Sequence, residues 1–248
     1  MTDLHDVEHP DDGGEWISVS DLMAGLMLIF LFIAIVYIRV QVAEKERAIE
    51  KTRELAQVQS QVQEIVVTWQ RSSERILDAL HAEFEDDLPR WNAEIVPKDI
   101  TIRFKAPEVL FDRGTAALKP EFEVILDDFF PRYLDVLSRH LDVIEEVRIE
   151  GHSSSEWMDG MEPLDAFFEN MRLSQDRTRT VLRHSLQLEA VEPNRAWATA
   201  KVTANGLSSS RLVLSDTGEE DREASRRVEF KVRTKTEQQI VRILETMQ

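Results

Sequence analysis

The sequence predicts an α+β protein in which a single N-terminal transmembrane helix is joined by a helical, coiled linker to a C-terminal β/α domain. Three observations predict this class: a long apolar run near the N-terminus, a charged stretch with heptad spacing after it, and a remainder in which short β-rich runs alternate with amphipathic helices. We therefore divide the chain into an acidic tail (1–15), a membrane helix (16–38), a linker (39–90) and a domain (91–248).

The apolar run at 17–38 is long enough to cross a membrane. Its only charge is Asp21, and as an α-helix it would measure roughly 33 Å, against about 30 Å for the hydrocarbon core. Residues 22–38 alone would give about 25 Å, so the helix must draw Asp21 to or inside the hydrocarbon boundary. A cleaved signal peptide is the rival interpretation, but such a peptide begins with basic residues, and residues 1–15 hold six acids and no Lys or Arg.

Asp21 needs a compensating reason to lie in the membrane, because a charge there costs about 2.5–3.5 kcal/mol even on insertion scales. Ala24 and Gly25 follow three and four residues later and share its helix face, where small residues let another helix approach closely. One interpretation is that Asp21 only caps the helix at the interface, where an acid complements the helix dipole. The alternative, which we favour, is an ion-carrying carboxylate that faces a partner.

The charges that flank the span favour a cytoplasmic domain. The positive-inside rule places the more basic side in the cytoplasm, and five basic residues follow the span: Arg39, Lys45, Arg47, Lys51 and Arg53. A resemblance described below implies the opposite orientation, and we follow that resemblance.

The linker carries the pattern of a coiled coil. From Val40 to about Phe84 the sequence is highly charged and holds no Gly or Pro. Apolar or small residues recur at alternating spacings of three and four: Leu55, Val58, Val62, Ile65, Trp69, Ser72, Ile76 and Ala79. A helix that packs on its own domain could show the same stripe. Directly outside a membrane, however, a second copy of the chain is the available surface, so the seam predicts a homodimer.

The rest of the chain predicts one compact domain of about 150 residues. We expect strands at 100–104, 146–150, 197–203 and 228–233, and helices at 119–140, 164–188 and 236–247. The strands and the helices between them follow the order β-α-β-α-β-β, which is typical of α/β and α+β domains.

Composition excludes some classes of partner and site. The chain carries 47 acidic and 30 basic side chains, a net charge of -17 at pH 7. This charge repels a phosphate backbone, so nucleic acid is not expected as a partner. Without cysteine the chain has no disulfide framework and no thiolate metal ligands.

A hydrolase built on His152 and nearby serines is improbable, because Gly151-His152-Ser153 lacks the second glycine of a nucleophile elbow. We expect neither an enzyme nor a cofactor.

Four motifs in the domain occur in the order of the OmpA-like peptidoglycan-binding family. They are Val109-Leu110-Phe111 with Gly114 and Leu118, then Ile149-Glu150-Gly151-His152-Ser153, then Asn170 to Arg177 (N-M-R-L-S-Q-D-R), and Arg226-Arg227-Val228-Glu229-Phe230. The chain resembles this family over roughly residues 95 to 235. The resemblance implies that Asn170 and Arg177, with Leu173 on the same helix face, bind the diaminopimelate of the cell-wall peptide. A guanidinium is well suited to grip a carboxylate.

The domain departs from the family pattern at Ser154. The family has an Asp there, which takes the ammonium group of the ligand, and the connection from Ser154 to Asn170 is about eight residues longer than is usual. Glu156 or Asp159 could compensate for the missing acid. A purely structural role for Arg177, as a helix arginine in a surface salt bridge, is the alternative.

The N-terminal half resembles a second group of proteins. Trp16-Ile17-Ser18-Val19-Ser20-Asp21-Leu22-Met23 is similar to the membrane helix of flagellar stator B subunits (MotB) and, in its W-I-S-x-x-D-L-M spacing, to the ZorB family of the Zorya anti-phage defence system. Both families join this helix to an OmpA-like domain, with the tail in the cytoplasm and the domain in the periplasm of a bacterial inner membrane.

These resemblances imply an ion-conducting, wall-anchored stator subunit of a rotary membrane motor, with Asp21 as the carrier of H⁺ or Na⁺. They also imply a ring of about five multi-span subunits, similar to ZorA or MotA, around two copies of this chain. A flagellar stator subunit is the first alternative. A passive envelope tether, which would tolerate Asp21→Asn, is an alternative of another class.

Overall fold

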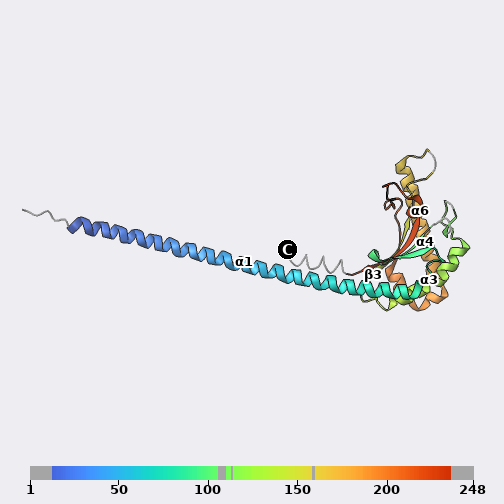
Figure 1. Cartoon of the computed structure of the whole chain (residues 1–248), viewed down its shortest axis with the longest axis horizontal. Helices are drawn as coiled ribbons and strands as arrows, with labels where there is room; N and C mark the ends of the chain where they lie inside the picture. The colour runs from blue at the N-terminus through green and yellow to red at the C-terminus, as the bar shows by residue number, and fades with distance from the viewer. Residues whose placement is uncertain (1–12, 106–109, 113, 158–159, 236–248) are drawn as a thin grey trace, which may run out of the picture. The chain divides into compact units, whose positions relative to one another are not determined.

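The computed structural model describes residues 13–105, 110–112, 114–157 and 160–235, with side chains from residue 20 onward. Its first element, α1 (Gly13–Phe84), is one continuous helix through the predicted membrane span and most of the predicted linker (Figure 1). Its part from Ser20 onward contains a stretch that is long and apolar enough to cross a membrane. The chain divides into two compact units, Met1–Gln61 and Val62–Gln248, so the end of α1 belongs to the second unit.

The second unit is built on a five-stranded mixed sheet. In chain order the strands are β1 (Ala93–Val96), β2 (Thr101–Lys105), β3 (Ile144–His152), β4 (Val202–Gly206) and β5 (Arg227–Thr234). Their order in the sheet is β1-β2-β5-β3-β4. The β3–β4 pair is parallel and the other pairs are antiparallel. The domain is therefore α+β, as the sequence predicts.

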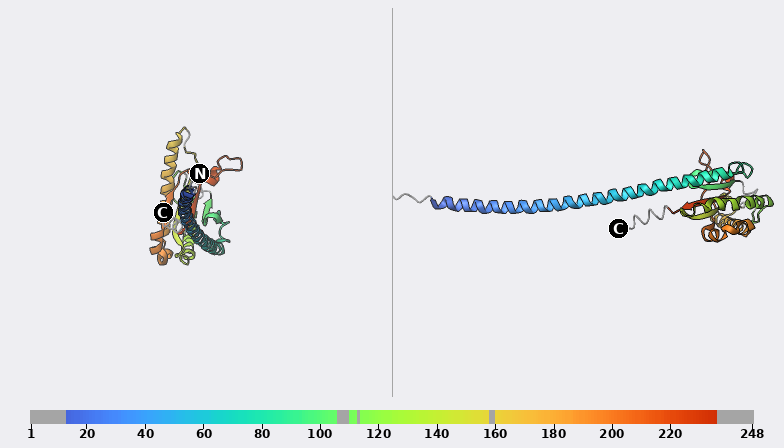
Figure 2. Two further views of the ribbon diagram at one scale, coloured as in Figure 1. Left: turned by 90° about the vertical axis from the view of Figure 1, so that its left-hand side faces the viewer. Right: turned by 90° about the horizontal axis from the view of Figure 1, so that it is seen from below.

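Two long helices, α3 (Pro120–Ser138) and α4 (Pro163–Gln187), pack against one face of this sheet. Two further α-helices, α5 (Arg195–Lys201) and α6 (Arg222–Ser225), are short. Two 3₁₀ helices, η1 (Pro97–Asp99) and η2 (Glu189–Asn194), complete the described elements. The domain can be followed from two further directions in Figure 2.

Aromatic rings fill the space between the sheet and the helices. Phe129 of α3 lies between Phe104 of β2 and Phe230 of β5, with ring centroids 5.1 and 5.0 Å away and near-perpendicular planes. Phe84, in the last turn of α1, packs on the same Phe129 at 5.3 Å. All four side chains are fully buried. The end of α1 is thus a part of the domain core.

Arg132 fastens the end of α1 to α3. Its Nε donates to Glu83 Oε1 at 2.7 Å, its Nη1 to Asp87 Oδ2 at 2.8 Å, and its Nη2 to the Glu83 carbonyl at 2.8 Å. The guanidinium also lies 5.0 Å from the ring centroid of Phe84. Burial would lower the pKa of Arg132, but the hydrogen bonds to Glu83, Asp87 and Asp128 outweigh it and raise that pKa.

The predicted heptad seam does not serve one purpose along its whole length. Ile76 is fully buried in the core of its own domain and Ala79 packs against that core, which corrects their assignment to a dimer seam. Burial inside the domain explains their spacing, because a helix that packs on its own sheet also needs an apolar stripe. Leu55, by contrast, is 53% exposed, so the dimer prediction now depends on the part of the seam up to Trp69.

The strand expected at 197–203 was misplaced. Residues Arg195–Lys201 form α5, and β4 begins only at Val202, where it pairs with Val147 of β3. Alanines alternate with larger residues here and imitate a strand, but alanine is the best helix former, and Trp197 Nε1 donates to Asn194 Oδ1 to fix the turn before the helix. Strand β1 was missed, and the helix expected at 236–247 lies outside the described residues.

The other face of the sheet is polar and densely charged. Across the strands Glu94 faces Arg103, Arg103 faces Glu229, and Glu229 faces Glu150. Burial would raise the pKa of the Glu229 carboxyl, but contacts with His152 and with the Arg227 guanidinium outweigh it and hold this pKa well below its usual range. The Glu229 carboxylate on this face is therefore both buried and ionised.

Candidate functional site

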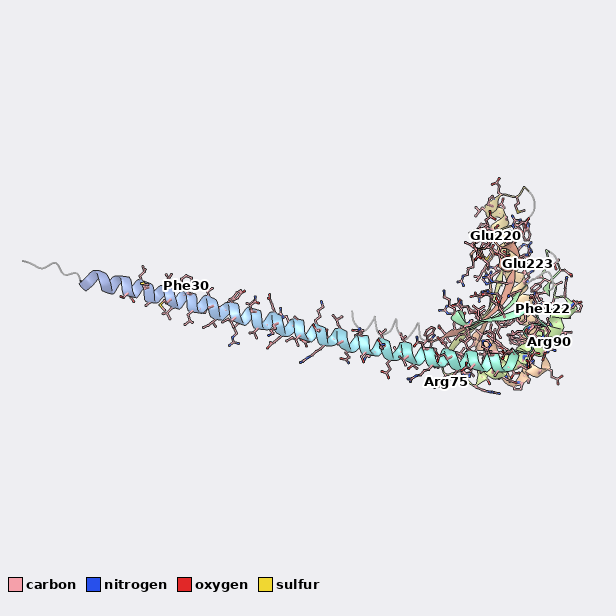
Figure 3. The ribbon with its side chains drawn as sticks, viewed as in Figure 1. Phe30, Arg75, Arg90, Phe122, Glu220 and Glu223 are labelled. Atoms are coloured by element: carbon pink, nitrogen blue, oxygen red, sulfur yellow. The ribbon has the colours of Figure 1, made fainter. Side chains whose placement is uncertain are left out.

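The membrane helix presents Asp21 on an otherwise apolar surface. Asp21 is exposed, and the large apolar side chains around it are exposed too, for example Leu22 at 76% and Phe30 at 62%. Figure 3 shows Phe30 projecting outward from α1. An exposed apolar surface of this size indicates contact with lipid or with another protein.

Small residues lie beside this carboxylate. Ala24 and Gly25 follow Asp21 by one helix turn, so the three share one face. A Cβ placed on Gly25 would meet no atom of the described residues within 4 Å, so none of these residues occupies the space next to it. The structure thus keeps Asp21, Ala24 and Gly25 together on a face that is free for a partner.

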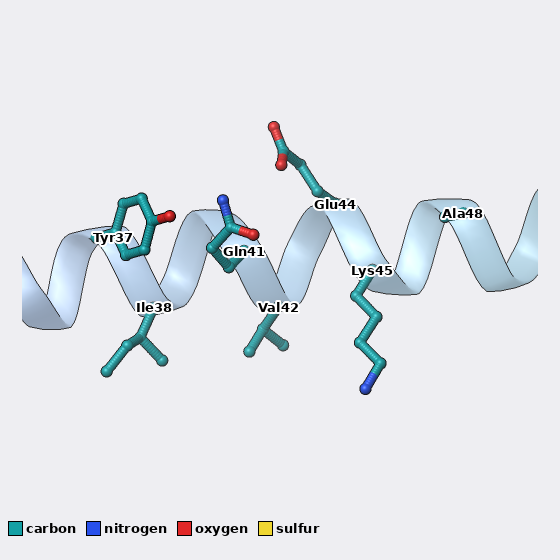
Figure 4. Close-up of a pocket in the computed structure, with 7 residues that line it drawn as sticks. All are labelled: Tyr37, Ile38, Gln41, Val42, Glu44, Lys45 and Ala48. Atoms are coloured by element: carbon teal, nitrogen blue, oxygen red, sulfur yellow. The ribbon is translucent and has the colours of Figure 1, made fainter.

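The helix surface just after the span is mixed in character. A shallow groove runs along α1 between Tyr37 and Ala48, and Figure 4 shows Ile38, Val42 and Lys45 on one side of the helix. Apolar and charged side chains here alternate along the helix, as expected where a helix leaves the hydrocarbon for the polar interface.

In the domain, two glycines let α4 approach the sheet closely. A Cβ on Gly151 of β3 would lie 2.8 Å from Thr178 Cγ2 and 3.0 Å from the Ser174 carbonyl, and one on Gly206 of β4 would lie 2.2 Å from the Gln175 nitrogen. Ser174 Oγ also accepts from the Ser208 nitrogen at 3.1 Å. The motif glycine Gly151 is therefore required by packing, and it positions the turn of α4 that carries Arg177.

Arg177 is held by a loop that the sequence motif already contained. Its Nε donates to the Thr115 carbonyl at 2.9 Å and its Nη2 to the Asp112 carbonyl at 3.4 Å. Its guanidinium also lies 4.8 Å from the ring centroid of Phe111. Gly114 turns this loop with a φ of 72°, a conformation that favours glycine. The loop thus fixes the orientation of the guanidinium.

A small cavity lies beneath Arg177. Leu173 and Arg177 line it from α4, and the facing residues are Phe111, His152 and Ser153. Its space of about 10 Å³ is about what one water molecule needs, so a peptide side chain does not fit inside it as it stands. A ligand carboxylate must reach Arg177 from outside or displace the carbonyls of Asp112 and Thr115.

Asn170 and Ser154, the other two predicted wall-binding residues, are buried and do not line this cavity. Asn170 is 3% exposed, and its Nδ2 donates to the carbonyls of Ser154 at 3.3 Å and Glu156 at 3.2 Å. Ser154 is 4% exposed. In this structure Asn170 fixes the loop after β3. Glu156 pairs with Arg222 at 3.4 Å, and Asp159 lies outside the described residues.

Sequence reasoning missed the parts of this site that hold Arg177. Phe111 stood in the motif, but its contact with Arg177, like those of Asp112 and Thr115, joins residues more than 60 positions apart, for which spacing gives no signal. It also missed Glu220, labelled in Figure 3, which accepts from the Ser155 nitrogen at 2.9 Å and stabilises the loop after β3.

Comparison with known proteins gives one curated relative over nearly the whole chain. The chain is 44% identical over 234 residues to the Zorya protein ZorB of Escherichia coli, covering 94% of each chain. No family model matches the chain.

Solved structures with partial similarity include a MotB-like protein from Desulfovibrio vulgaris, at 21% identity and a TM-score of 0.47, covering 69% of this chain and 94% of that one. The cell wall anchor of the T6SS from Pseudomonas aeruginosa matches at 23% identity and a TM-score of 0.43, covering 62% and 96%. The periplasmic domain of Helicobacter pylori MotB matches at 15% identity and a TM-score of 0.41, covering 62% and 90%.

Proposed function

The chain belongs to the ZorB family, and from this premise we propose that it is the ion-conducting, wall-anchored stator subunit of a rotary membrane motor in anti-phage defence. Two copies of the chain stand inside a ring of multi-span partner subunits. The tail lies in the cytoplasm and the domain in the periplasm. The ring turns, and the two copies stay still.

The observation that carries this proposal is Asp21, a carboxylate exposed on an apolar helix surface with Ala24 and Gly25 beside it. An ionised carboxylate is costly against lipid and is drawn to a polar path in the partner, whereas a protonated one is tolerated against apolar surface. Alternation between these two states, driven by about 2.3 kcal/mol per charge per 100 mV of membrane potential, moves the partner stepwise.

The domain supplies the fixed point. Arg177 presents an oriented guanidinium next to Leu173 at the surface of α4, and a guanidinium makes charge-assisted bonds to carboxylates, such as those of the wall peptide. Because the end of α1 is packed into the domain core and fastened by Arg132, a domain held by the wall also holds the membrane helix. Torque on the ring then does external work.

The first prediction tests the ion carrier. Asp21→Asn keeps the size of the side chain but removes its titratable charge, so the protein should still reach the membrane and bind its partner while protection against phage is lost. The measurement is plaque formation on cells that express this chain with its membrane partner, alongside a membrane fractionation and a pull-down of the partner.

Glu44→Gln is the matched control, because it makes the same chemical change on the same helix beyond the apolar span. We expect this variant to keep full protection. Full protection by Asp21→Asn would instead leave a passive tether as the function. A loss of the Asp21→Asn protein from membranes would assign Asp21 a structural role.

A further inference from the structure

Three buried side chains converge on the polar face of the sheet. Glu150 and His152 alternate along β3, and Glu229 lies opposite Glu150 on β5. They are 2%, 3% and 6% exposed. Carboxylates are seldom buried to this degree without a partner that compensates their charge.

His152 is the member of this cluster that the protein leaves unsatisfied. Both of its ring nitrogens are buried, and neither makes a hydrogen bond with any residue that the structure describes. The nearest carboxylate oxygens to Nε2 are Glu229 Oε2 at 3.5 Å and Glu150 Oε2 at 3.7 Å, both longer than a normal hydrogen bond. Buried ring nitrogens that make no hydrogen bond are unfavourable, and an ion bound between the imidazole and the two carboxylates would satisfy Nε2.

We propose that Glu150, His152 and Glu229 bind a divalent transition-metal ion of the Zn²⁺ type. One ligand atom from each residue lies within 4.8 Å of the other two. Metal–ligand bonds of about 2.0–2.2 Å in a tetrahedral site place neighbouring ligand atoms about 3.3–3.6 Å apart, close to the separations of 3.5 and 3.7 Å at His152 Nε2. One imidazole with two carboxylates is a donor set that suits zinc better than calcium or magnesium, and a water can complete the fourth position.

The surrounding arginines orient one ligand. Arg103 Nε and Arg227 Nε donate to the same oxygen of Glu229, Oε1, at 2.8 and 2.7 Å. This leaves Oε2 of Glu229 for the side that faces His152. Hydrogen bonds to the outer oxygen of a ligating carboxylate are the usual second layer of a metal site.

Arg211 is the cation that competes with a metal. Its Nη1 lies 3.5 Å from Glu150 Oε2, but its side chain is 54% exposed. A long, half-exposed arginine can turn its guanidinium into solvent, which would free Glu150 to bind the ion. Removing the Arg211 charge should therefore strengthen metal binding without altering any ligand.

The test is a Zn²⁺ titration of the full-length chain in detergent, without an affinity tag and in competition with a chromophoric chelator. The two histidines near the N-terminus, His5 and His9, are first replaced by Gln so that they do not bind the metal. We expect one Zn²⁺ per chain, binding at least about tenfold weaker in His152→Gln, and tighter binding in Arg211→Met.

His184→Gln is the matched control, because His184 Nε2 also contacts a carboxylate, Asp127 Oδ1 at 2.7 Å, but outside the cluster. It should bind Zn²⁺ as the parent does. Equal affinity in the parent and His152→Gln would overturn the proposal. If His152→Gln does not fold, the Arg211→Met variant provides the test, because it keeps all three ligands. A Zn²⁺ affinity of Arg211→Met no higher than that of the parent would also overturn the proposal.

Discussion

Arg177 lies beside Leu173 on α4, and backbone carbonyls of a neighbouring loop hold its guanidinium. The sequence motif placed it, with Leu173, on one face of a helix, and the structure has both residues lining one cavity. The motif did not indicate that the guanidinium would donate to the carbonyls of Asp112 and Thr115. A ligand must therefore compete with the loop for the same donors.

The prediction for this residue concerns binding to the cell wall. Arg177→Ala should weaken the binding of the full-length chain to purified sacculi by roughly ten- to a hundredfold, because a hydrogen bond to a charged group contributes about 1.5–3 kcal/mol. Arg177→Lys should recover only part of this loss, since an ammonium lacks the planar fork of donors. Co-sedimentation over a range of sacculus concentrations measures both.

Arg179→Ala is the control for this experiment. Arg179 lies on the same helix, is 69% exposed and pairs with Asp176, so its removal should leave sacculus binding unchanged. Equal retention of the Arg177→Ala and Arg179→Ala variants would exclude a role for Arg177 in binding the wall.

Ser154, which the family resemblance assigns to the wall-binding site, is a buried residue of the loop after β3. The family resemblance expects an acid at this position to meet an ammonium group. The structure buries Ser154 almost completely, and its carbonyl accepts from Asn170. A carboxylate buried to this degree would be desolvated, which is costly unless a partner compensates its charge.

Among the elements, α1 was predicted best in its apolar part and least well at its end. Hydropathy alone identifies a candidate membrane span, because lipid imposes one requirement on a whole run of residues. The sequence pattern could not show which seam residues pack inside the domain and which stay exposed. A stripe that faces a second copy and a stripe that faces the sheet have the same period. The hydrogen bonds of Arg132 could not be predicted from the sequence either, because Glu83 and Arg132 are 49 positions apart.

This division gives a prediction that separates the two halves of the seam. Ile76→Ala should destabilise the domain by about 2–5 kcal/mol, as expected for a fully buried isoleucine, and should lower its thermal midpoint. Leu55→Ala, at a position 53% exposed, should leave the thermal midpoint unchanged but reduce chemical cross-linking between two copies of the chain in membranes. A large loss of domain stability in Leu55→Ala would mean that Leu55 belongs to the domain instead.

At the scale of the whole molecule, one chain joins a carboxylate in the membrane to a domain that we propose is held by the wall. This arrangement requires the domain to lie outside the cytoplasm. The basic residues after the span favour the opposite orientation, so the family assignment and the charge rule make contrary predictions about the same chain. Contacts with a ring of partner subunits can outweigh a charge bias of this kind.

The absence of cysteine from the chain allows this central claim to be measured directly. A single cysteine is introduced either near the N-terminus, by Thr2→Cys, or at an exposed position of the domain, by Asp216→Cys, and intact cells are treated with a membrane-impermeant maleimide. We predict that Asp216→Cys is labelled in intact cells and that Thr2→Cys is labelled only after the membrane is broken. Labelling of Thr2→Cys together with protection of Asp216→Cys would place the domain in the cytoplasm and contradict the wall-anchored stator.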